Sequence, residues 1–539
     1  MEPVPHTVKP PRPRIERTVR LALAGLILIC LTANMAFIAH KSAPRGLDEL
    51  DVFAEGVYFH TAGAGLLGLW TMQTDEEIGC PPLLPWAGRL CTALLGRGYM
   101  QMAFAATLFQ ALLLLSMYGI GRRLSGPGAG LLAAAIAATS PIIMSYSRIF
   151  TTNLPALAMI GCVLWALLYS QRFTRRRSGL LVGALIALAN LAERGTPPLA
   201  LSLPVVFWCM FSILKARKQP EAFRRVIVQV VIAALVATAL SGRYLYFYFF
   251  RTASHIAALG AQDVFGSQSQ FVVDRLPEWL FYPATLFVVQ LSFVWALPFV
   301  IALPFFLRRF SAEKLLLILQ TLWPMAVMTP FASKVYDFDL GAVAGAIPIA
   351  AVGLASIPWR SIRAVLGVAA GLLACLAFWA MNPSLLPQPQ WPLAVRDWLG
   401  HMNNVGLLMP SDTVYQNRIA QDLARRVPPD ERWLFIYNVE PSGPLDSLVC
   451  ETANFSWLQF PHSEQYAILD PNVPQDGTIE VEIRPLSAEQ RRLYRATYFR
   501  PPCAMVGYDP PLVPERSAPC RPIYSAEVDG REFLWKLCE

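Results

Sequence analysis

Residues 19–40 read VRLALAGLILICLTANMAFIAH, and their one charged side chain belongs to Arg20. A membrane-spanning helix needs about 20 mostly apolar residues, so this stretch predicts a transmembrane helix. It is too long and uninterrupted for a cleaved signal peptide, and no small-residue cleavage site follows it.

Of all 539 residues, 55% are hydrophobic and 15% are charged, against about 25% charged in average soluble domains. This composition excludes a disordered chain, a disulfide miniprotein and an ordinary soluble enzyme.

Further apolar runs follow the first one along the chain. With it they make eleven candidate spans, near residues 19–40, 99–119, 127–146, 153–170, 178–192, 197–214, 225–241, 281–307, 313–331, 340–357 and 363–381. We therefore expect a polytopic α-helical membrane protein with about 11 transmembrane helices.

The basic residues give the predicted orientation. Residues 1–381 hold 31 Lys and Arg and 17 Asp and Glu, a net charge of +14. With the N-terminus inside, 21 of those 31 basic residues fall in inner segments, as cytoplasmic loops of membrane proteins require. The inner clusters are residues 9–20, 122–123, 172–177, 215–225, 308–314 and 360–363. Short basic clusters between apolar runs indicate membrane topology, and they disfavour nucleic-acid binding.

The resulting layout has a membrane part and a polar tail. We expect a basic cytoplasmic N-terminus (1–18), a transmembrane domain (19–381), a linker containing Pro and Trp (382–400) and an extracytoplasmic soluble domain (401–539). Two long outer loops are expected within the transmembrane domain, at 41–98 and 242–280, and residues 62–70 are read as an interfacial helix. Residues 382–539 hold 14 basic and 20 acidic residues, a net charge of −6.

The sequence of the tail predicts a small α+β domain. Residues 431–438 (ERWLFIYN), 477–483 (GTIEVEI) and 532–538 are expected strands, and residues 487–498 an expected helix. The tail also holds four cysteines: Cys450, Cys503, Cys520 and Cys538. An even number of cysteines in an outward-facing domain fits one or two disulfides; four unpaired core thiols are the alternative.

An acidic segment, LDELDVFAE at residues 47–55, follows the first span. Clustered carboxylates raise one another's pKa or recruit a cation, so they suit a general base or a metal site. Asp48 and Asp51 have the spacing to hold a divalent cation, although no metal or other cofactor is required by the sequence. A solvated interfacial loop is the alternative interpretation, and it is the one we prefer for the acidic run at residues 75–77.

The segment CPPLLPW follows at residues 80–86. An acidic segment after the first span, followed by Pro-Pro-Leu-x-x-Trp, resembles the GT-C glycosyltransferases, most closely the protein mannosyltransferase and lipid A aminoarabinose transferase group. The resemblance extends in layout over about residues 15–380, and its distinctive motifs lie in residues 47–90. It implies a GT-C-like fold and a sugar donor linked to a polyprenyl phosphate, used on the extracytoplasmic face.

The resemblance also implies roles for single residues. Asp48 matches the family's catalytic base, Glu49 its neighbour and Glu55 the later Glu of that segment. Residues 146–148 (YSR), 192–196 (AERGT) and 333–336 (SKVY) resemble three further family segments. The chain departs from the family pattern at Cys80, where Lys or His is usual, at Asn153, where an Asp is expected, and at Arg194, which replaces a Lys.

A departing lipid phosphate needs cations and hydrogen-bond donors around it. The candidate substrate- and phosphate-binding residues, all in predicted outer segments, are Glu55, Arg148, Arg194, Arg243, His255, Lys334 and Tyr336. Arg243 and His255 lie in an aromatic stretch that fits an interfacial belt equally well.

The function expected is therefore a glycosyltransferase of the plasma (inner) membrane with its active site and tail on the periplasmic side. Its partners would be the polyprenyl-phosphate sugar donor, the bilayer and a glycan, lipid or protein acceptor. A lipid-linked glycan transporter and a non-catalytic GT-C-like scaffold are the alternatives. A transporter is disfavoured because the spans carry almost no charge, whereas acidic residues gather at their outer ends.

Overall fold

The computed structural model describes two compact units of the chain. One comprises Met1–Ala36, Ala106–Arg148 and Thr152–Met409, and is called the helical unit below; the other comprises Phe37–Ala105, Ile149–Thr151 and Pro410–Glu539. The described residues are 13–40, 81–193, 195–261, 277–308, 310–330, 339–380, 415–428, 431, 433–439, 464–469, 478–485, 505–506, 519–528 and 531–538.

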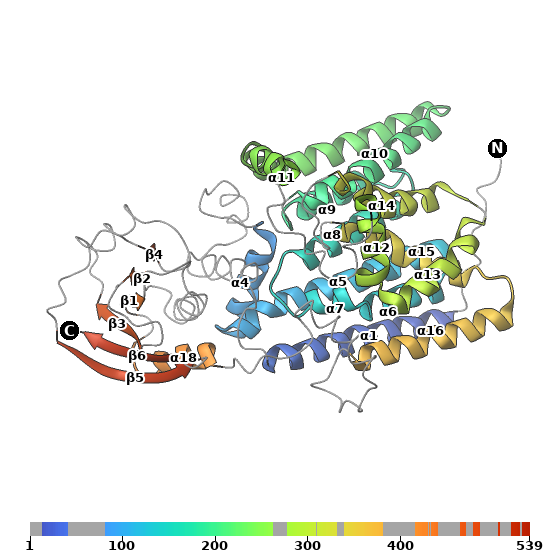
Figure 1. Cartoon of the computed structure of the whole chain (residues 1–539). Helices are drawn as coiled ribbons and strands as arrows, with labels where there is room; N and C mark the ends of the chain where they lie inside the picture. Colours follow the sequence, from blue (N-terminus) through green and yellow to red (C-terminus); the bar gives the residue numbers. More distant parts are fainter. Residues whose placement is uncertain are drawn as a thin grey trace. The chain divides into compact units, whose positions relative to one another are not determined.

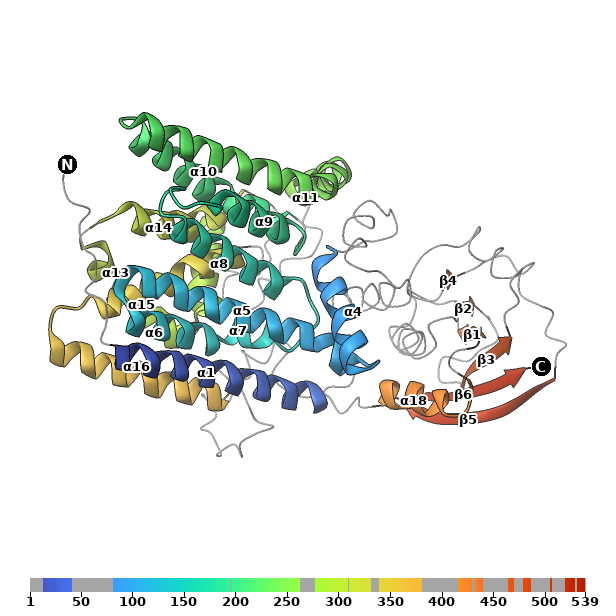
Figure 2. The same ribbon diagram turned by 180° about the vertical axis from the view of Figure 1, so that it is seen from behind.

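Helices make up nearly all of the described membrane part (Figures 1 and 2). They are α1 (Pro13–His40), α4 (Leu83–Leu95), α5 (Tyr99–Ser125), α6 (Pro127–Ala138), α7 (Pro141–Tyr146), α8 (Asn153–Tyr169), α9 (Ser178–Asn190), α10 (Thr196–Ala216), α11 (Pro220–Ala261), α12 (Phe281–Thr285), α13 (Ser292–Leu307), α14 (Ala312–Met328), α15 (Val343–Ala355) and α16 (Arg360–Ala380). Two of them are central: α9 packs against α8 and α11, and α15 packs against α6, α13 and α14.

Several of these helices have the length and composition of membrane spans. Among the described residues, four qualify outright: Glu16–Ala39, Tyr99–Ser125, Thr196–Ala216 and Pro220–Tyr246. A bent pair makes a fifth, and five further apolar helices are shorter. A polytopic helical membrane fold is thus confirmed, whereas the count of eleven spans stays a prediction.

The run at residues 281–307, expected to be one span, is broken. Phe281–Gln290 and Val294–Leu307 meet at 116°, after a π-helical turn over Leu286–Gln290 and at Ser292, whose φ of 54° is unusual for a residue with a side chain. Sharp bends in helices have such local causes. Hydropathy alone could not show the break because both halves are apolar.

The second long outer segment, expected over residues 242–280, is helical in its first part. Helix α11 continues without interruption to Ala261. The physical reason is visible in the sequence, because no proline occurs between Pro220 and Pro277 to end the helix. The proposed interfacial helix at residues 62–70 lies outside the described residues, whereas α4 is an additional helix inside the segment 41–98.

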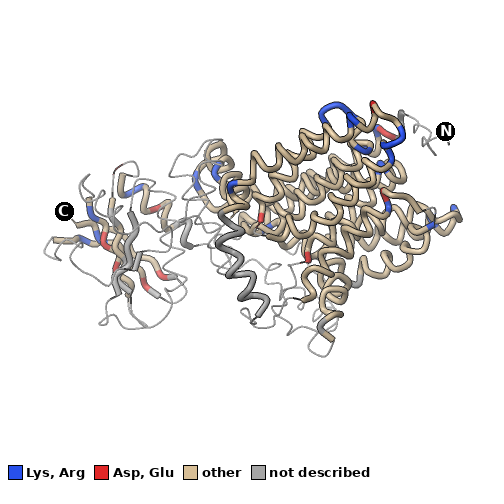
Figure 3. Tube along the Cα trace, turned by 90° about the horizontal axis from the view of Figure 1, so that it is seen from above, with Lys and Arg blue, Asp and Glu red and all other residues tan. Residues whose placement is uncertain are grey.

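Basic residues from the predicted inner segments gather at one end of the helical bundle (Figure 3). Glu16 accepts hydrogen bonds from Arg20 and Arg122, which joins the first two segments. Arg172 lies 3.8 Å from Glu313. Arg172 and Lys215 both lie over the ring of Phe211, at 5.3 and 6.0 Å from its centroid. Segments far apart in the sequence therefore share this end, as the charge pattern predicts.

The described part of the tail forms a mixed sheet and the helix α18 (Tyr415–Ala424). Its strands are β1 (Trp433–Val439), β2 (Glu464–Leu469), β3 (Ile479–Pro485), β4 (Met505–Val506), β5 (Cys520–Val528) and β6 (Arg531–Cys538), in the order β4-β2-β1-β3-β6-β5. The pairs β1–β2, β2–β4 and β3–β6 are parallel, whereas β1–β3 and β5–β6 are antiparallel. Ile419 and Leu423 of α18 join Phe435, Val481 and Trp535 of the sheet in one apolar core.

Three predicted strands are confirmed, as β1, β3 and β6, with boundaries shifted by one or two residues. Helix α18 and strands β2, β4 and β5 were not predicted; β5 contains Pro522, which disfavours a strand within a sheet. The predicted helix at 487–498 lies outside the described residues.

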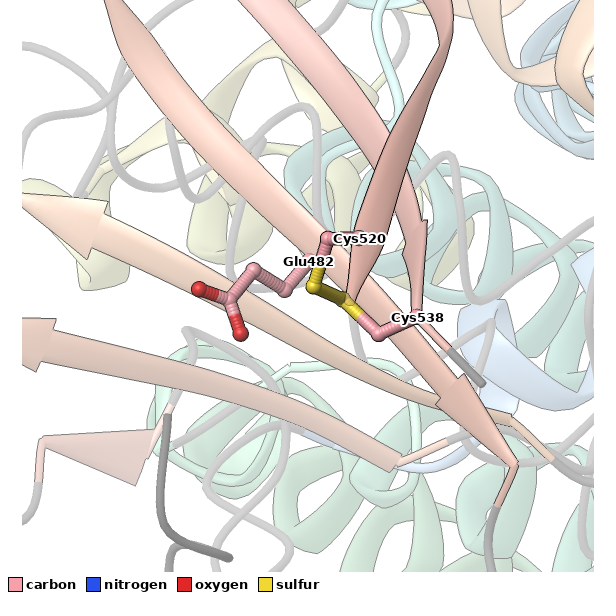
Figure 4. Close-up of side chains that lie close together, drawn as sticks. All are labelled: Glu482, Cys520 and Cys538. Atoms are coloured by element: carbon pink, nitrogen blue, oxygen red, sulfur yellow. A yellow bond between two sulfur atoms is a disulfide. The ribbon is translucent and has the colours of Figure 1, made fainter. Parts of the chain in front are cut away.

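One of the predicted tail disulfides is present, between Cys520 and Cys538 (Figure 4). The two cysteines face each other across the antiparallel pair β5–β6. Glu482 of the adjacent strand β3 lies close enough that the three side chains form a group with metal-ligand spacing. Because a thiolate is the sulfur species that binds a metal, these two sulfurs offer no ligand while the disulfide is intact.

Candidate functional site

Arg148 is the predicted site residue whose environment is described most fully. It lies between α7 and α8, directly after Tyr146 and Ser147, and it is fully buried. Its Nε–H donates a hydrogen bond to Oδ1 of Asn34, at 3.0 Å. Burial lowers the pKa of the Arg148 guanidinium to about 9, which still leaves it protonated at neutral pH. The helical unit therefore holds a buried positive charge at a loop between helices.

The amide of Asn34 links three parts of the helical unit. Its Nδ2 donates to Oε1 of Gln110 and to Oγ of Ser147, each at 2.8 Å. Thr107 Oγ1 donates to the carbonyl oxygen of Ser147 at 3.0 Å. Helix α1 is thus connected to α5 and to the segment that carries Arg148. We call Asn34, Gln110, Ser147 and Arg148 the Asn34 cluster; all four residues are fully buried.

A second buried polar contact lies where the described chain resumes at Asp339. This residue is fully buried, and its Oδ1 accepts a hydrogen bond of 2.6 Å from Nε2 of Gln290. The Gln290 carbonyl in turn accepts from Ser140 Oγ at 2.7 Å. Gln290 is the last residue before the break between α12 and α13, so its hydrogen bond connects this break to Asp339.

The turn between α9 and α10 contains part of the predicted segment 192–196. Gly195 has a φ of 74°, which favours glycine. Beside it, Thr196 Oγ1 donates to Glu193 at 3.2 Å. Arg194, between them, lies outside the described residues.

The other predicted site residues are placed only in part. Arg243 is exposed on helix α11, and His255 lies further along the same helix with its side chain outside the description. Several predicted site residues lie outside the described part of the chain: Asp48, Glu49, Asp51, Glu55, Arg194, Lys334 and Tyr336. Their roles stay predictions, as does a cation held by Asp48 and Asp51.

Sequence reasoning missed the amides that organise these contacts. Asn34, Gln110 and Gln290 each lie within a run interpreted as an apolar span. Polar side chains inside membrane spans are costly, and they usually have a partner or a function. An isolated amide within an apolar run could therefore be singled out from the sequence. The sequence does not show which of these amides contact one another.

Comparison with known proteins shows a family match over part of the chain and a similar fold. The family model described as dolichyl-phosphate-mannose-protein mannosyltransferase matches residues 80–240. No curated relative matches the sequence of the chain.

Two crystal structures of ArnT from Cupriavidus metallidurans resemble the structure. The one bound to undecaprenyl phosphate has 14% sequence identity and a TM-score of 0.53, covering 83% of this chain and 85% of ArnT. The apo structure has 16% identity and a TM-score of 0.53, covering 83% and 86%. Residues 80–240 are thus similar to the mannosyltransferase family, and the fold of the chain resembles that of ArnT.

Proposed function

We propose that this protein transfers a sugar from a polyprenyl-phosphate donor to an acceptor on the extracytoplasmic face of the membrane. The observation that carries the proposal is the match to the mannosyltransferase family over residues 80–240, which begins at the CPPLLPW motif behind the acidic segment. The fold adds support, because the similar ArnT structure contains undecaprenyl phosphate.

The proposed reaction is a direct displacement at the anomeric carbon. Asp48 accepts the proton of the acceptor hydroxyl or amine as that group attacks. A bond forms between the acceptor atom and the anomeric carbon, and the bond from that carbon to the phosphate oxygen breaks. The polyprenyl phosphate leaves with the bonding electron pair. Glu49 and Glu55 lie in the same acidic segment as the proposed base.

The leaving phosphate carries negative charge, so cations that contact it lower the barrier. Arg148 is the proposed partner whose position is described, and it is charged and removed from water. Electrostatic attraction is stronger in such a low-dielectric site. Arg194, Lys334 and Tyr336 are proposed as further phosphate ligands, with Arg243 and His255 at the outer margin.

The orientation proposed for the membrane follows from the basic end of the bundle. Lys and Arg are enriched on the cytoplasmic side of membrane proteins, and basic residues of the predicted inner segments lie at one end of the bundle (Figure 3). We place that end in the cytoplasm of a cell with a plasma (inner) membrane. The acidic segment and the tail would then lie on the periplasmic side.

Substitution of the proposed base tests this function. A strain lacking the protein is complemented with the wild type, with Asp48→Asn or with Asp75→Asn, and polyprenyl-phosphate sugars are measured by lipid mass spectrometry. We expect a lipid-linked sugar to accumulate in the deletion strain and with Asp48→Asn, because the amide cannot accept the proton. Asp75→Asn is the matched control from the run interpreted as solvated, and it should clear the lipid.

Two outcomes would contradict the proposal. Clearance by Asp48→Asn would remove Asp48 as the base. No accumulation in the deletion strain would favour a non-catalytic scaffold over an enzyme.

A further inference from the structure

The basic end of the bundle has a local structure that membrane orientation alone does not require. Two connections reach this end, residues 169–177 between α8 and α9 and residues 215–225 between α10 and α11. Their one acidic residue is Glu221, and their nine basic residues are Arg172, Arg175, Arg176, Arg177, Lys215, Arg217, Lys218, Arg224 and Arg225. Such an excess of positive charge attracts anions.

Three of these cations lie over aromatic rings. Cζ of Arg175 is 4.0 Å from the centroid of the Tyr169 ring. Cζ of Arg172 and Nζ of Lys215 are 5.3 and 6.0 Å from the centroid of the Phe211 ring. The face of an aromatic ring attracts a cation, so the Phe211 ring brings together charges from both connections. We call these five residues the aromatic-basic site.

The cations of the aromatic-basic site keep hydrogen-bond donors for a further partner. Within the part of the chain that the structure describes, the side chains of Arg175 and Lys215 form no hydrogen bond or ion pair, and Arg172 lies 3.8 Å from the carboxylate of Glu313. The Arg172 side chain is 41% exposed, and Lys215 is also exposed. An anion that contacts both cations would offset their mutual repulsion.

The surface of α10 that leads to this site is apolar and uncovered. Val206, Met210 and Leu214 follow one another at intervals of four residues, so they lie on one face of the helix. Each of the three side chains is more than half exposed, and Lys215 is the next residue along the chain. A molecule that fits both surfaces has an anionic head and apolar chains.

We propose that the aromatic-basic site binds the phosphate of an anionic phospholipid from the bilayer leaflet at this end of the bundle. Arg172 and Lys215 contact the phosphate from the two connections, Arg175 adds further donors, and the acyl chains lie along the exposed face of α10. The phospholipid is a ligand that links the two connections, and it takes no part in sugar transfer. The inference is therefore independent of the proposed function.

Two matched variants separate a formed site from the total charge of this end. Each replaces three cations by glutamine, so both lose the same charge. The test variant carries Arg172→Gln, Arg175→Gln and Lys215→Gln. The control variant carries Arg217→Gln, Lys218→Gln and Arg224→Gln. The three control residues are exposed, and within the described ranges none of them lies over an aromatic ring.

The experiment measures the affinity of the full chain, in a neutral detergent, for fluorescent phosphatidylglycerol. We expect unlabelled phosphatidylglycerol to displace this probe, whereas phosphatidylcholine and inorganic phosphate do not at the same concentration. The test variant should bind the probe about tenfold or more weakly, because its charge-assisted contacts are lost. The control variant should stay within about threefold of the wild type. The Tm of both lipid-free variants should be equal, because exposed ion pairs contribute little.

Four outcomes would overturn the inference. Failure of the wild-type chain to bind phosphatidylglycerol would remove the ligand, and equal weakening in both variants would show that binding follows total charge. Displacement by phosphatidylcholine would show that the anionic head is not recognised. Displacement by inorganic phosphate would show that the site binds free phosphate instead of a lipid.

A pair of single variants covers the case in which the test variant has a lower Tm than the control variant. Arg175→Gln and Arg224→Gln are then compared in the same assay. Arg175→Gln should weaken phosphatidylglycerol binding by about threefold or more, because one charge-assisted contact is lost, whereas Arg224→Gln should not. Equal affinity in these two variants would overturn the inference.

Discussion

Arg148 is a cation removed from water, and its position depends on a residue of another helix. Its Nε–H is bound by Asn34 at 3.0 Å, and its neighbour Ser147 is bound by Asn34 and by Thr107. These contacts fix the loop between α7 and α8 to α1 and α5. The Asn34 amide is therefore one of the contacts that hold the positive charge in place.

We expect Arg148→Lys to reduce undecaprenyl phosphate affinity by about tenfold or more, although the charge is kept, because an ammonium group cannot form the paired contacts of a guanidinium. The change also leaves Oδ1 of Asn34 without its donor, at a cost of about 1–3 kcal/mol. Affinity and Tm are measured in detergent. Arg123→Lys, at the basic end, serves as control, and equal affinity in both variants would remove Arg148 from the phosphate site.

The sequence led to Arg148 through the segment YSR at residues 146–148, but not to its partner. Asn34 and Gln110 are single amides in long apolar runs, so a hydropathy averaged over each run does not show them. Their meeting depends on how α1 and α5 are rotated about their axes. That rotation is set by packing across the whole bundle, so one-dimensional spacing could not predict it.

At the scale of elements, close helix packing depends on small residues. Gly179 and Gly183 of α9 are four residues apart, and a methyl group on either would come within 2.4 Å of a backbone oxygen of α11. Such small-xxx-small spacing lets membrane helices approach closely. The pair α9–α11 is therefore held at a distance that larger side chains would not allow.

Gly183→Ile should destabilise the protein by roughly 1–3 kcal/mol, because the side chain would have to push α11 away. Gly367→Ile is the matched control, since a methyl group at Gly367 of α16 would meet nothing within 4 Å. Thermal unfolding in detergent measures both. A Tm loss in Gly367→Ile as large as that in Gly183→Ile would show that the close approach of α9 and α11 is not the cause.

The element boundaries show what the apolar pattern can predict. It located most helices and three strands, but it treated residues 281–307 as one span and ended the helix before residue 242. The break at Ser292 and the continuation of α11 to Ala261 depend on local backbone geometry and on a missing helix breaker. An average of hydropathy over many residues detects neither of these two features.

At the scale of the whole molecule, the proposed orientation across the membrane rests on the distribution of charge and on the disulfide of the tail. The basic front and the acidic tail differ in sign, and the tail contains the disulfide Cys520–Cys538. Disulfides persist in oxidising compartments. The disulfide therefore supports the proposed position of the tail outside the cytoplasm.

Reporter fusions test this orientation. Alkaline phosphatase, which needs an oxidising compartment, should be active when fused after Glu539 and inactive when fused after Lys218 in the predicted inner segment. The opposite pattern would reverse the proposed orientation. Activity at both sites would contradict the positions predicted for the inner loops.

The most direct measurement of the proposed function is transfer by the purified chain. It is added to membranes of the deletion strain, which hold donor and acceptor, and lipid-linked sugar and free polyprenyl phosphate are followed by mass spectrometry. The proposed function predicts loss of the lipid-linked sugar with equimolar release of polyprenyl phosphate, and no change with Asp48→Asn. Persistence of the lipid-linked sugar in the presence of the wild-type chain would contradict it.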